Sequence, residues 1–402
     1  MNAPPQRLSR RRLYVASWST DCALILLVFA VSRELAEQGE SLGTLGWVGG
    51  GFSLLMGISS VVCGRLSDGW SRRGMILTGQ VLLILGIAGM ALSRDWFPIT
   101  IAAYWMSGLA VGAIYPPIIA WITGGDGTGR RRQSDVSRVL ITFCLAWNLG
   151  MICGQLGGGF LFAFDSRSPL WVALSLAVVN VGLFLRAVEP AALVPVAEDA
   201  ADPDAAKERS LSSAFARVGW VANLGGAFSI GLILHLFPHL AVSLDISSER
   251  HGIMLGIMRV AIVGVYLVMH SLSFWHHRFS VHLAVQAVAL AGLWQLTRAT
   301  TEAGLVLGLC ALGCLLGFNY FASTFYSTTG SHDRKKGFFS GINEGVIALG
   351  IATGSLVGGL WGLHAGLRAP YLLGMVVLAV FIIAQCAMVR VIARQSRRVC
   401  PS

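Results

Sequence analysis

Charged residues are scarce in this sequence. Of its 402 residues, 12% are Asp, Glu, Lys or Arg, and 55% are hydrophobic. Soluble globular proteins carry about a quarter charged residues, so this composition argues against a soluble domain. It indicates a chain that lies in a membrane.

Acidic residues are fewer than basic ones, and the formal net charge is +10. A basic balance can indicate a nucleic-acid partner, but here the basic residues do not gather on one element. They recur between long apolar runs, which is typical of loops that face an anionic lipid leaflet. We therefore expect a lipid bilayer, and no nucleic acid, as the partner of the basic residues.

The eight cysteines form neither a disulfide framework nor a metal-ligand pattern, because all but Cys400 fall in apolar runs. The sequence also lacks a Ser-His-Asp or paired-carboxylate arrangement, so we expect no catalytic residues, no metal, no cofactor and no enzymatic activity. The first apolar run, Leu13 to Val31, has no small-residue cleavage site. We therefore interpret it as a membrane span rather than a cleavable signal.

Long apolar runs recur along the whole chain. A helix needs about 20 apolar residues to cross the hydrocarbon core of a bilayer. By that measure the sequence predicts twelve spans, near residues 13–32, 43–63, 75–93, 97–121, 139–163, 169–187, 213–240, 252–273, 281–298, 303–327, 338–362 and 369–390. An even number of spans puts both termini on the same side of the membrane.

The distribution of Arg and Lys predicts which side that is. With the N-terminus inside, basic residues concentrate in the cytoplasmic segments, for example around Arg10, Arg72 and Arg131, whereas the opposite side holds few, such as Arg94 and Arg167. Cytoplasmic loops of membrane proteins carry this excess. We therefore expect a multi-pass protein of a plasma membrane, such as a bacterial inner membrane, with both termini in the cytoplasm.

The chain divides into two halves. Residues 189–212 are polar, contain Pro190, Pro195 and Pro203, and are interpreted as a cytoplasmic linker between residues 1–188 and 213–402, with six spans each. Parts of the first half recur in the second: Leu149–Gly159 matches Leu349–Gly359, and the surroundings of span 4 match those of span 10. The halves therefore repeat in parallel.

A charged segment, Gly64 to Gly74, lies between spans 2 and 3. It resembles the loop motif Gly-x-x-x-Asp-Arg/Lys-x-Gly-Arg-Arg/Lys of the major facilitator superfamily. Gly64, Asp68, Arg72 and Arg73 match the motif, whereas Gly69 and Ser71 stand where the family has a base and a glycine.

The resemblance implies an all-α membrane protein with twelve transmembrane helices in two pseudo-symmetric six-helix bundles. It implies alternating-access transport of a small molecule, with a binding site between the halves near the midplane, and a monomer is the usual state of this fold. The motif would act as a conformational latch, in which Asp68 pairs with Arg72 near the start of span 11, at Gly337 and Phe338. In the other interpretation, the basic residues only fix the topology. The equivalent segment of the second half has Phe274 in place of the Asp.

Glycines recur every four residues in spans 5 and 11, a spacing that lets helix backbones approach closely in lipid; these are Gly150, Gly154, Gly158, Gly350, Gly354 and Gly358. The span-5 pattern also resembles a helix-5 motif of antiporters, but Gln155 replaces its proline. Tyr104 stands in the place of the Arg that marks the helix-4 motif of proton antiporters. Both departures weaken an inference of antiport.

Ionisable side chains inside spans indicate a transport pathway, because a charge in hydrocarbon costs several kcal/mol unless it faces a cavity or a partner. Three stand out: Asp21 in span 1, Arg259 in span 8 and Glu344 in span 11. Asp21 is the first candidate for proton coupling and Glu344 the second, since burial favours the protonated form of a carboxyl group. A purely structural, hydrogen-bonded Asp21 is the alternative.

Arg259 would either neutralise one of these carboxylates or bind an anionic substrate. Further candidates for the substrate cavity are polar and aromatic residues of the spans: Tyr104, Tyr115, Trp147, Asn223, Asn319, Tyr320 and Asn343. The leading hypothesis is secondary active transport, as proton-coupled export of an amphipathic compound. The alternatives are an organic-anion transporter centred on Arg259, for uptake or export, and a non-transporting sensor or lipid-handling protein of the same fold.

Overall fold

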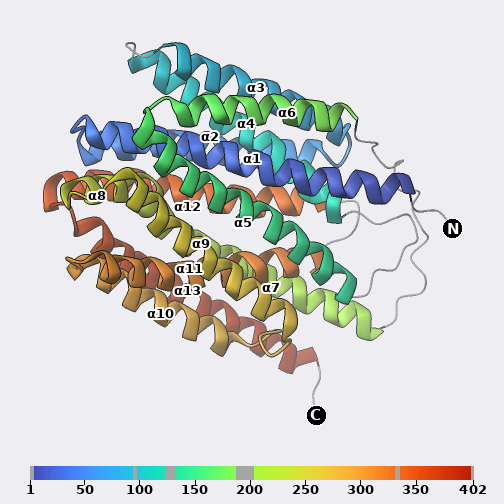
Figure 1. Ribbon diagram of the computed structural model, residues 1–402. Coiled ribbons are helices and arrows are strands. Elements are labelled where there is room, and N and C mark those ends of the chain that lie inside the picture. Colours follow the sequence, from blue (N-terminus) through green and yellow to red (C-terminus); the bar gives the residue numbers. More distant parts are fainter. Residues whose placement is uncertain (1–3, 94–96, 124–132, 187–202, 331–335, 400–402) are drawn as a thin grey trace.

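The computed structural model describes residues 4–93, 97–123, 133–186, 203–330 and 336–399. All the elements in this part of the chain are helical (Figure 1). They are α1 (Pro4–Glu37), α2 (Leu42–Leu66), α3 (Arg72–Leu92), α4 (Phe97–Thr123), α5 (Gln133–Phe164), α6 (Ser168–Leu185), α7 (Pro203–Gly231), the π-helix η1 (Leu232–Leu236), α8 (Phe237–Ser243), α9 (Ser248–Ser271), α10 (Phe279–Arg298), α11 (Glu302–Gly330), α12 (Lys336–Ala365) and α13 (Ala369–Val399).

Twelve of the described helical segments are long and apolar enough to cross a membrane, with α7, η1 and α8 together forming one of them. This confirms the prediction of twelve spans. The start of α1 and the end of α13 lie at the same end of the bundle (Figure 1). Several basic residues on which the predicted orientation rests, Arg130, Arg131, Arg132, Arg334 and Lys335, lie outside the described residues.

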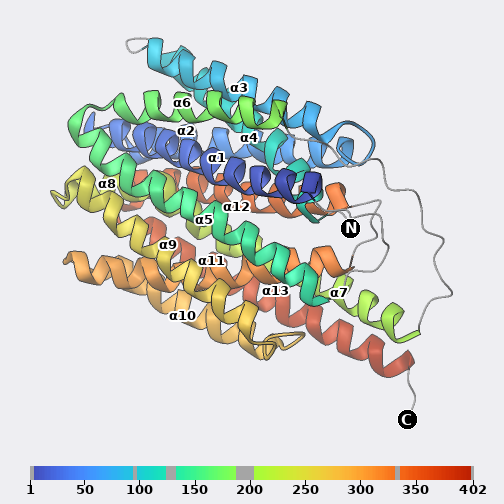
Figure 2. The same ribbon diagram turned by 45° about the vertical axis from the view of Figure 1, so that its right-hand side comes forward.

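The helices form two bundles with the same internal packing. In the first half α1 packs against α5 and α6, α2 against α4, and α3 against α4 and α6. In the second half α7 packs against α12 and α13, α9 against α11, and α10 against α11 and α13. Each of these contacts in one half has its counterpart in the other. Figure 2 shows α5 and α12 running between the other helices of the two halves. The predicted pseudo-symmetric architecture is confirmed.

The seventh span differs from the expected single helix over 213–240. The helix α7 begins at Pro203, so it includes the last ten positions of the segment interpreted as a linker; proline suits the first turn of a helix because its missing N–H has no partner there. Further along, η1 widens the helix, and the N–H of Phe237 bonds to the carbonyl of Leu232. Pro238 follows, and a proline in a regular helix clashes with the carbonyl four residues before it. The π turn accommodates this proline.

The two halves touch backbone to backbone along α2 and α12. A Cβ built on Gly46 would lie 2.4 Å from the carbonyl oxygen of Ser355, and one on Gly64 would lie 2.7 Å from the carbonyl oxygen of Gly337. A second, shorter contact joins α5 to α9, where a Cβ on Gly159 would lie 2.6 Å from the carbonyl oxygen of Ser248. Only glycine permits such approaches.

The glycines that recur every four residues in α5 and α12 lie inside the bundles. Gly150 faces the backbone of Trp18 on α1, and Gly354 faces that of Phe228 on α7. Because α1 and α7 occupy equivalent places, the same spacing serves the same contact in both halves. The neighbours along each row, Gly154, Gly158, Gly350 and Gly358, also face α1 or the seventh span.

We predict that Gly354→Val destabilises the protein, because its Cβ would lie 2.0 Å from the carbonyl oxygen of Phe228. Overpacking of this kind costs about 1–3 kcal/mol. The melting temperature of the purified protein should fall well below that of Gly182→Val, the control, where a Cβ meets nothing within 4 Å. Equal melting temperatures would contradict the predicted contact.

Candidate functional site

Asp68 joins the two halves at the end of the bundle that holds the α2–α3 loop. Its Oδ1 accepts the backbone N–H of Gly337 at 2.8 Å, and its Oδ2 accepts that of Phe338 at 3.0 Å. Both N–H groups belong to the first turn of α12, where a helix has unsatisfied donors and the positive end of its dipole. The side chain predicted to form a latch therefore caps a helix of the opposite half.

Arg72 and Arg73 fix the loop around this carboxylate. The Nε of Arg72 donates to the carbonyl of Ser67 at 3.3 Å, and its guanidinium also donates to Ala120 on α4 at 3.2 Å. Arg73 donates to the carbonyl of Leu185 at the end of α6. Partial burial raises the pKa of Asp68, whereas the N–H groups of Phe338 and Gly337 and the charge of Arg72 oppose that rise.

The equivalent loop of the second half makes a different contact. Trp275 is buried against Phe325 and Tyr326 of α11, and the N–H of His277 donates to the hydroxyl of Tyr326 at 2.7 Å. Partial burial lowers the pKa of His277 and of its neighbour His276. Aromatic packing therefore fixes this loop to its own bundle. The equivalent loop of the first half instead contacts the other bundle through the carboxylate of Asp68.

The opposite end of the bundle is also closed in this structure. Arg33 at the end of α1 donates to the carbonyl of Ile246 at 3.0 Å and pairs with Glu37 at 2.7 Å. Nearby, the hydroxyl of Ser32 lies 3.4 Å from Nδ1 of His235 in η1. Contacts between the halves therefore exist at both ends, and the residues between them are enclosed.

Asp21 lies in this enclosed centre and is 1% exposed. The hydroxyl of Tyr115 on α4 donates to its Oδ1, and its Oδ2 has no hydrogen-bond partner among the described residues. Asp21 also lies close enough to Arg259 and Glu344 to interact with both electrostatically. The structure thus brings together the three ionisable residues singled out in the sequence.

Glu344 occupies a similar position in the second half. Its Oε1 accepts the hydroxyl of Tyr320 on α11 at 3.2 Å and the amide of Asn343 at 3.3 Å. Asn343 in turn accepts from Ser323 at 2.8 Å and from Asn223 of α7 at 3.2 Å. Tyr115 and Tyr320 are the two repeat-related tyrosines, so each half holds one carboxylate with the same side chain.

Arg259 of α9 is 4% exposed and forms no ion pair or hydrogen bond with the described residues. Its Nε is buried without a partner. A buried charge without a hydrogen-bonded partner is expensive, because the nearby charge of Asp21 offsets only part of the desolvation. We call Asp21, Tyr115, Arg259, Tyr320, Asn343 and Glu344 the central polar cluster.

Aromatic rings from both halves border this cluster. The ring of Trp147 on α5 lies 4.8 Å from that of Tyr320, and Tyr266 of α9 lies 6.5 Å from each of these two rings. The sequence analysis did not single out Tyr266. The only signal for it is its position seven residues after Arg259, which places both on one face of α9.

Two other predicted cavity residues have separate surroundings. Tyr104 is fully buried and stacks on Phe52 of α2, with ring centroids 4.5 Å apart. The amide of Asn319 donates to the carbonyl of Ala222 at 2.9 Å, which links α11 to α7. Neither contact involves the central polar cluster.

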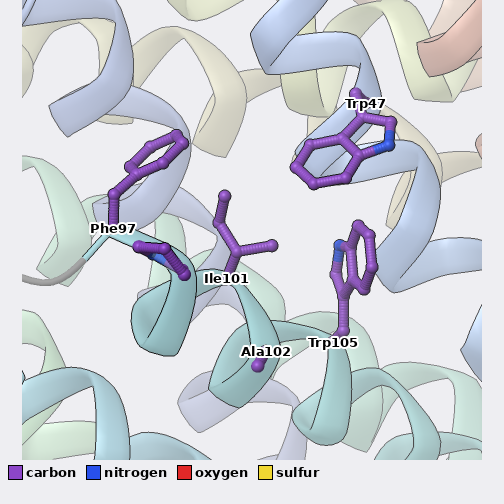
Figure 3. A pocket seen from close by; sticks show the side chains of 6 residues that line it. Trp47, Phe97, Ile101, Ala102 and Trp105 are labelled. Carbon is purple, nitrogen blue, oxygen red and sulfur yellow. The ribbon is translucent and has the colours of Figure 1, made fainter.

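An apolar cavity of about 240 Å³ lies between the N-terminal parts of α2 and α4. Figure 3 shows Ile101 between Phe97 and Trp105, and the ring of Trp47 meets that of Trp105 edge to face, with ring centroids 4.7 Å apart. Trp47 and Phe97 are exposed on the outer surface. The cavity has no polar side chain that could orient a solute, so it is not the candidate transport site.

The fold, the capped loop and the enclosed polar centre agree with one family. The sequence model of the Major Facilitator Superfamily matches residues 13–343. The chain belongs to this superfamily. No curated protein matches the chain.

Solved structures of facilitator-superfamily transporters share the fold. The human organic anion transporter MFSD10 (TETRAN) has a TM-score of 0.69 at 17% identity, over 95% of this chain and 100% of its own. A mutant of the nucleoside transporter NupG has a TM-score of 0.67 at 14% identity, over 94% of this chain and 99% of its own. At these identities the likeness shows the fold alone.

We predict that Asp68→Asn weakens the closure of this facilitator at the α2–α3 end. Loss of the charge at the start of α12 costs about 1 kcal/mol, a roughly fivefold rise in the open population. Spin labels on R65C and R209C, introduced into a cysteine-free background, report the distance between the halves. The distribution should shift to longer distances in D68N but not in D165N, an exposed carboxylate of the α5–α6 loop. Identical distributions for D68N and the parent protein would contradict the latch.

Proposed function

We propose that this protein carries out proton-coupled transport of a small organic anion by alternating access. The observation that carries the proposal is Arg259, a buried guanidinium in the enclosed centre whose Nε has no hydrogen-bond partner among the described residues. The superfamily is one of secondary transporters, and the anion and the proton are the proposed parts.

An anionic substrate would neutralise the positive charge of Arg259 in the enclosed centre. A guanidinium in a low-dielectric site is stabilised by a carboxylate that accepts two of its N–H groups. The carboxylates Asp21 and Glu344 are instead held by tyrosine hydroxyls. The guanidinium N–H groups of Arg259 therefore remain available to bind a solute.

Proton coupling follows from competition for the same positive charge. When Asp21 is ionised, its charge offsets that of Arg259 and weakens the attraction of Arg259 for another anion. When Asp21 is protonated, that attraction is restored, so the proton and the anion favour each other's binding. Coupling of this sign is reciprocal. The proton and the anion would then move together, in the direction set by the proton gradient.

A second candidate is proton-coupled export of an amphipathic cation. The unpartnered Oδ2 of Asp21, near the rings that border the centre, favours it. A cation and a proton would compete for Asp21, and competition of this kind produces exchange rather than co-transport. Arg259 counts against this candidate, because a fixed positive charge repels a cation.

One structural neighbour is named an organic anion transporter, but at 17% identity it supports only the fold. Orientation with both termini in the cytoplasm, the monomeric state and the division at residues 189–212 stay predictions of the sequence. A non-transporting sensor or lipid-handling protein also stays an alternative, and an absence of flux for every solute class would favour it.

The first test of the proposed function concerns Arg259. In proteoliposomes with an acidic outside, wild-type protein should accumulate labelled organic anions from a mixed panel of aliphatic and aromatic carboxylates. Arg259→Gln should lower the rate at least tenfold, because it removes the charge that binds the anion. Arg250→Gln, at an exposed arginine of the same helix, is the matched control. Transport of carboxylates that survives R259Q unchanged would sink the proposal.

The second test concerns Asp21. Asp21→Asn should abolish accumulation driven by the pH gradient while leaving exchange of labelled for unlabelled anion, because exchange needs no net proton movement. Transport of a panel of cationic dyes in the same vesicles distinguishes the second candidate, export of a cation, from transport of an anion. Loss of pH-driven dye export in D21N, with no carboxylate transport by the wild type, would favour export of a cation instead.

A further inference from the structure

His251 of α9 is buried at the end of the bundle that holds Arg33, which we call the Arg33 end. The residue is 1% exposed, and neither of its ring nitrogens has a hydrogen-bond partner among the described residues. A neutral imidazole carries one donor and one acceptor, and buried groups of both kinds are almost always satisfied. The burial of this histidine therefore needs an explanation.

The imidazole lies in the contact between the two halves. Its ring centroid is 4.9 Å from that of Phe29 on α1 and 5.5 Å from that of Phe237 on α8. Phe29 in turn meets Phe162 of α5 edge to face, with centroids 6.3 Å apart. Phe29 belongs to the first half, whereas His251 and Phe237 belong to the second. Alternating access separates the halves at one end at a time, so the contact of His251 with Phe29 requires a closed Arg33 end.

The backbones next to His251 are also in contact across the halves. A Cβ built on Gly252 would lie 2.5 Å from the carbonyl oxygen of Gln155, and one on Gly159 would lie 2.6 Å from that of Ser248. The first turn of α9 is therefore pressed against α5. Because this contact and the aromatic rings cover His251, bulk water reaches the imidazole only when the halves separate.

The charges near His251 disfavour an imidazolium in the closed state. Arg33 of α1 acts on the imidazole electrostatically, and Nη1 of Arg33 is itself buried without a partner, although Nε pairs with Glu37. His251 also lies in the first turn of α9, where the helix dipole is positive. The other titratable groups at this end do not hydrogen-bond to the imidazole; they are Glu34, Asp165, His235, His239, Asp245, Glu249, Arg250, Glu302 and His364.

A proton on His251 and closure of the Arg33 end therefore oppose each other. Closure would transfer an imidazolium from water to a site with no acceptor and a like charge nearby. The faces of the two phenylalanine rings attract a cation, but this attraction does not replace the lost hydration. Opening restores water to both ring nitrogens, so the open state binds the proton more tightly. By linkage, the proton favours the open state to the same extent.

We propose that His251 is a proton-binding site that controls the Arg33 end of the transporter. With a neutral imidazole this end closes on the rings of Phe29 and Phe237, and protonation of His251 opens it. The site lies on the same helix as Arg259 but at the end of the pathway rather than in the central polar cluster. The inference goes beyond the proposed function, because it does not depend on which solute is carried.

Distances across the Arg33 end test the proposal. Spin labels on Q38C in the α1–α2 turn and A303C in the first turn of α11 are both exposed and belong to opposite halves. The full chain, in a cysteine-free background, is measured in lipid nanodiscs without solute. Between about pH 7.5 and about pH 5.5, the ratio of open to closed molecules should rise roughly tenfold, because an exposed histidine takes up its proton near about pH 6.5.

Variants assign this response to His251. His251→Phe keeps a ring between Phe29 and Phe237 but binds no proton, so its distances should be the same at both pH values. His251→Gln should also lose the response, whatever its distribution at the higher pH. His364→Gln is the control, because His364 is an exposed histidine in the last turn of α12, at the same end of the bundle, and this variant should respond like the parent protein.

Two results would overturn the proposal. In the first, the parent protein shows no change in distance between the two pH values. In the second, H251F and H251Q both keep the response of the parent, which would assign it to another group, such as Asp21. Failure of anion transport in proteoliposomes would leave this inference unaffected, since the distances are measured without a solute.

Discussion

Contact between the two halves depends on how closely two helix backbones can approach. In a bilayer, apolar side chains gain little by meeting each other, so small residues must bring the helices together. The α2–α12 contact meets this need with glycines such as Gly46 and Gly64, at opposite ends of α2. Two consequences follow from this alignment. The first turn of α12 comes within reach of Asp68, and Asn343 and Glu344 on the same helix lie in the enclosed centre.

The repeat supplies a symmetric scaffold, and the charges break its symmetry. Tyr115 and Tyr320 are equivalent and each donates to a carboxylate of its own half. The carboxylates themselves come from α1 in one half and α12 in the other, which are not equivalent helices. Arg259 has no counterpart at all in the central polar cluster. The chemistry proposed for this site therefore resides in the residues that depart from the repeat, and the packing resides in those that follow it.

Much of this organisation could be predicted from the sequence, because it depends on local patterns. Apolar runs indicated the spans. The resemblance of Gly64–Gly74 to the superfamily motif implied that Asp68 lies near Gly337 and Phe338, where its hydrogen bonds are. The partner of Asp21 could not be predicted, since Tyr115 lies 94 positions away and nothing local links the two. Tyr266 resembles any aromatic residue in an apolar helix until Arg259 is seen on the same face.

The π turn in the seventh span alters how its faces must be assigned. A π turn holds one more residue than an α turn, and each residue advances an α-helix by about 100°. A helical wheel drawn from α7 straight through Leu232–Leu236 would therefore rotate every later position by about that angle. Phe237, Pro238, Leu240 and Ala241 are all buried, so such a wheel would assign them to the wrong neighbours. The directions of the side chains before and after the π turn have to be assigned separately.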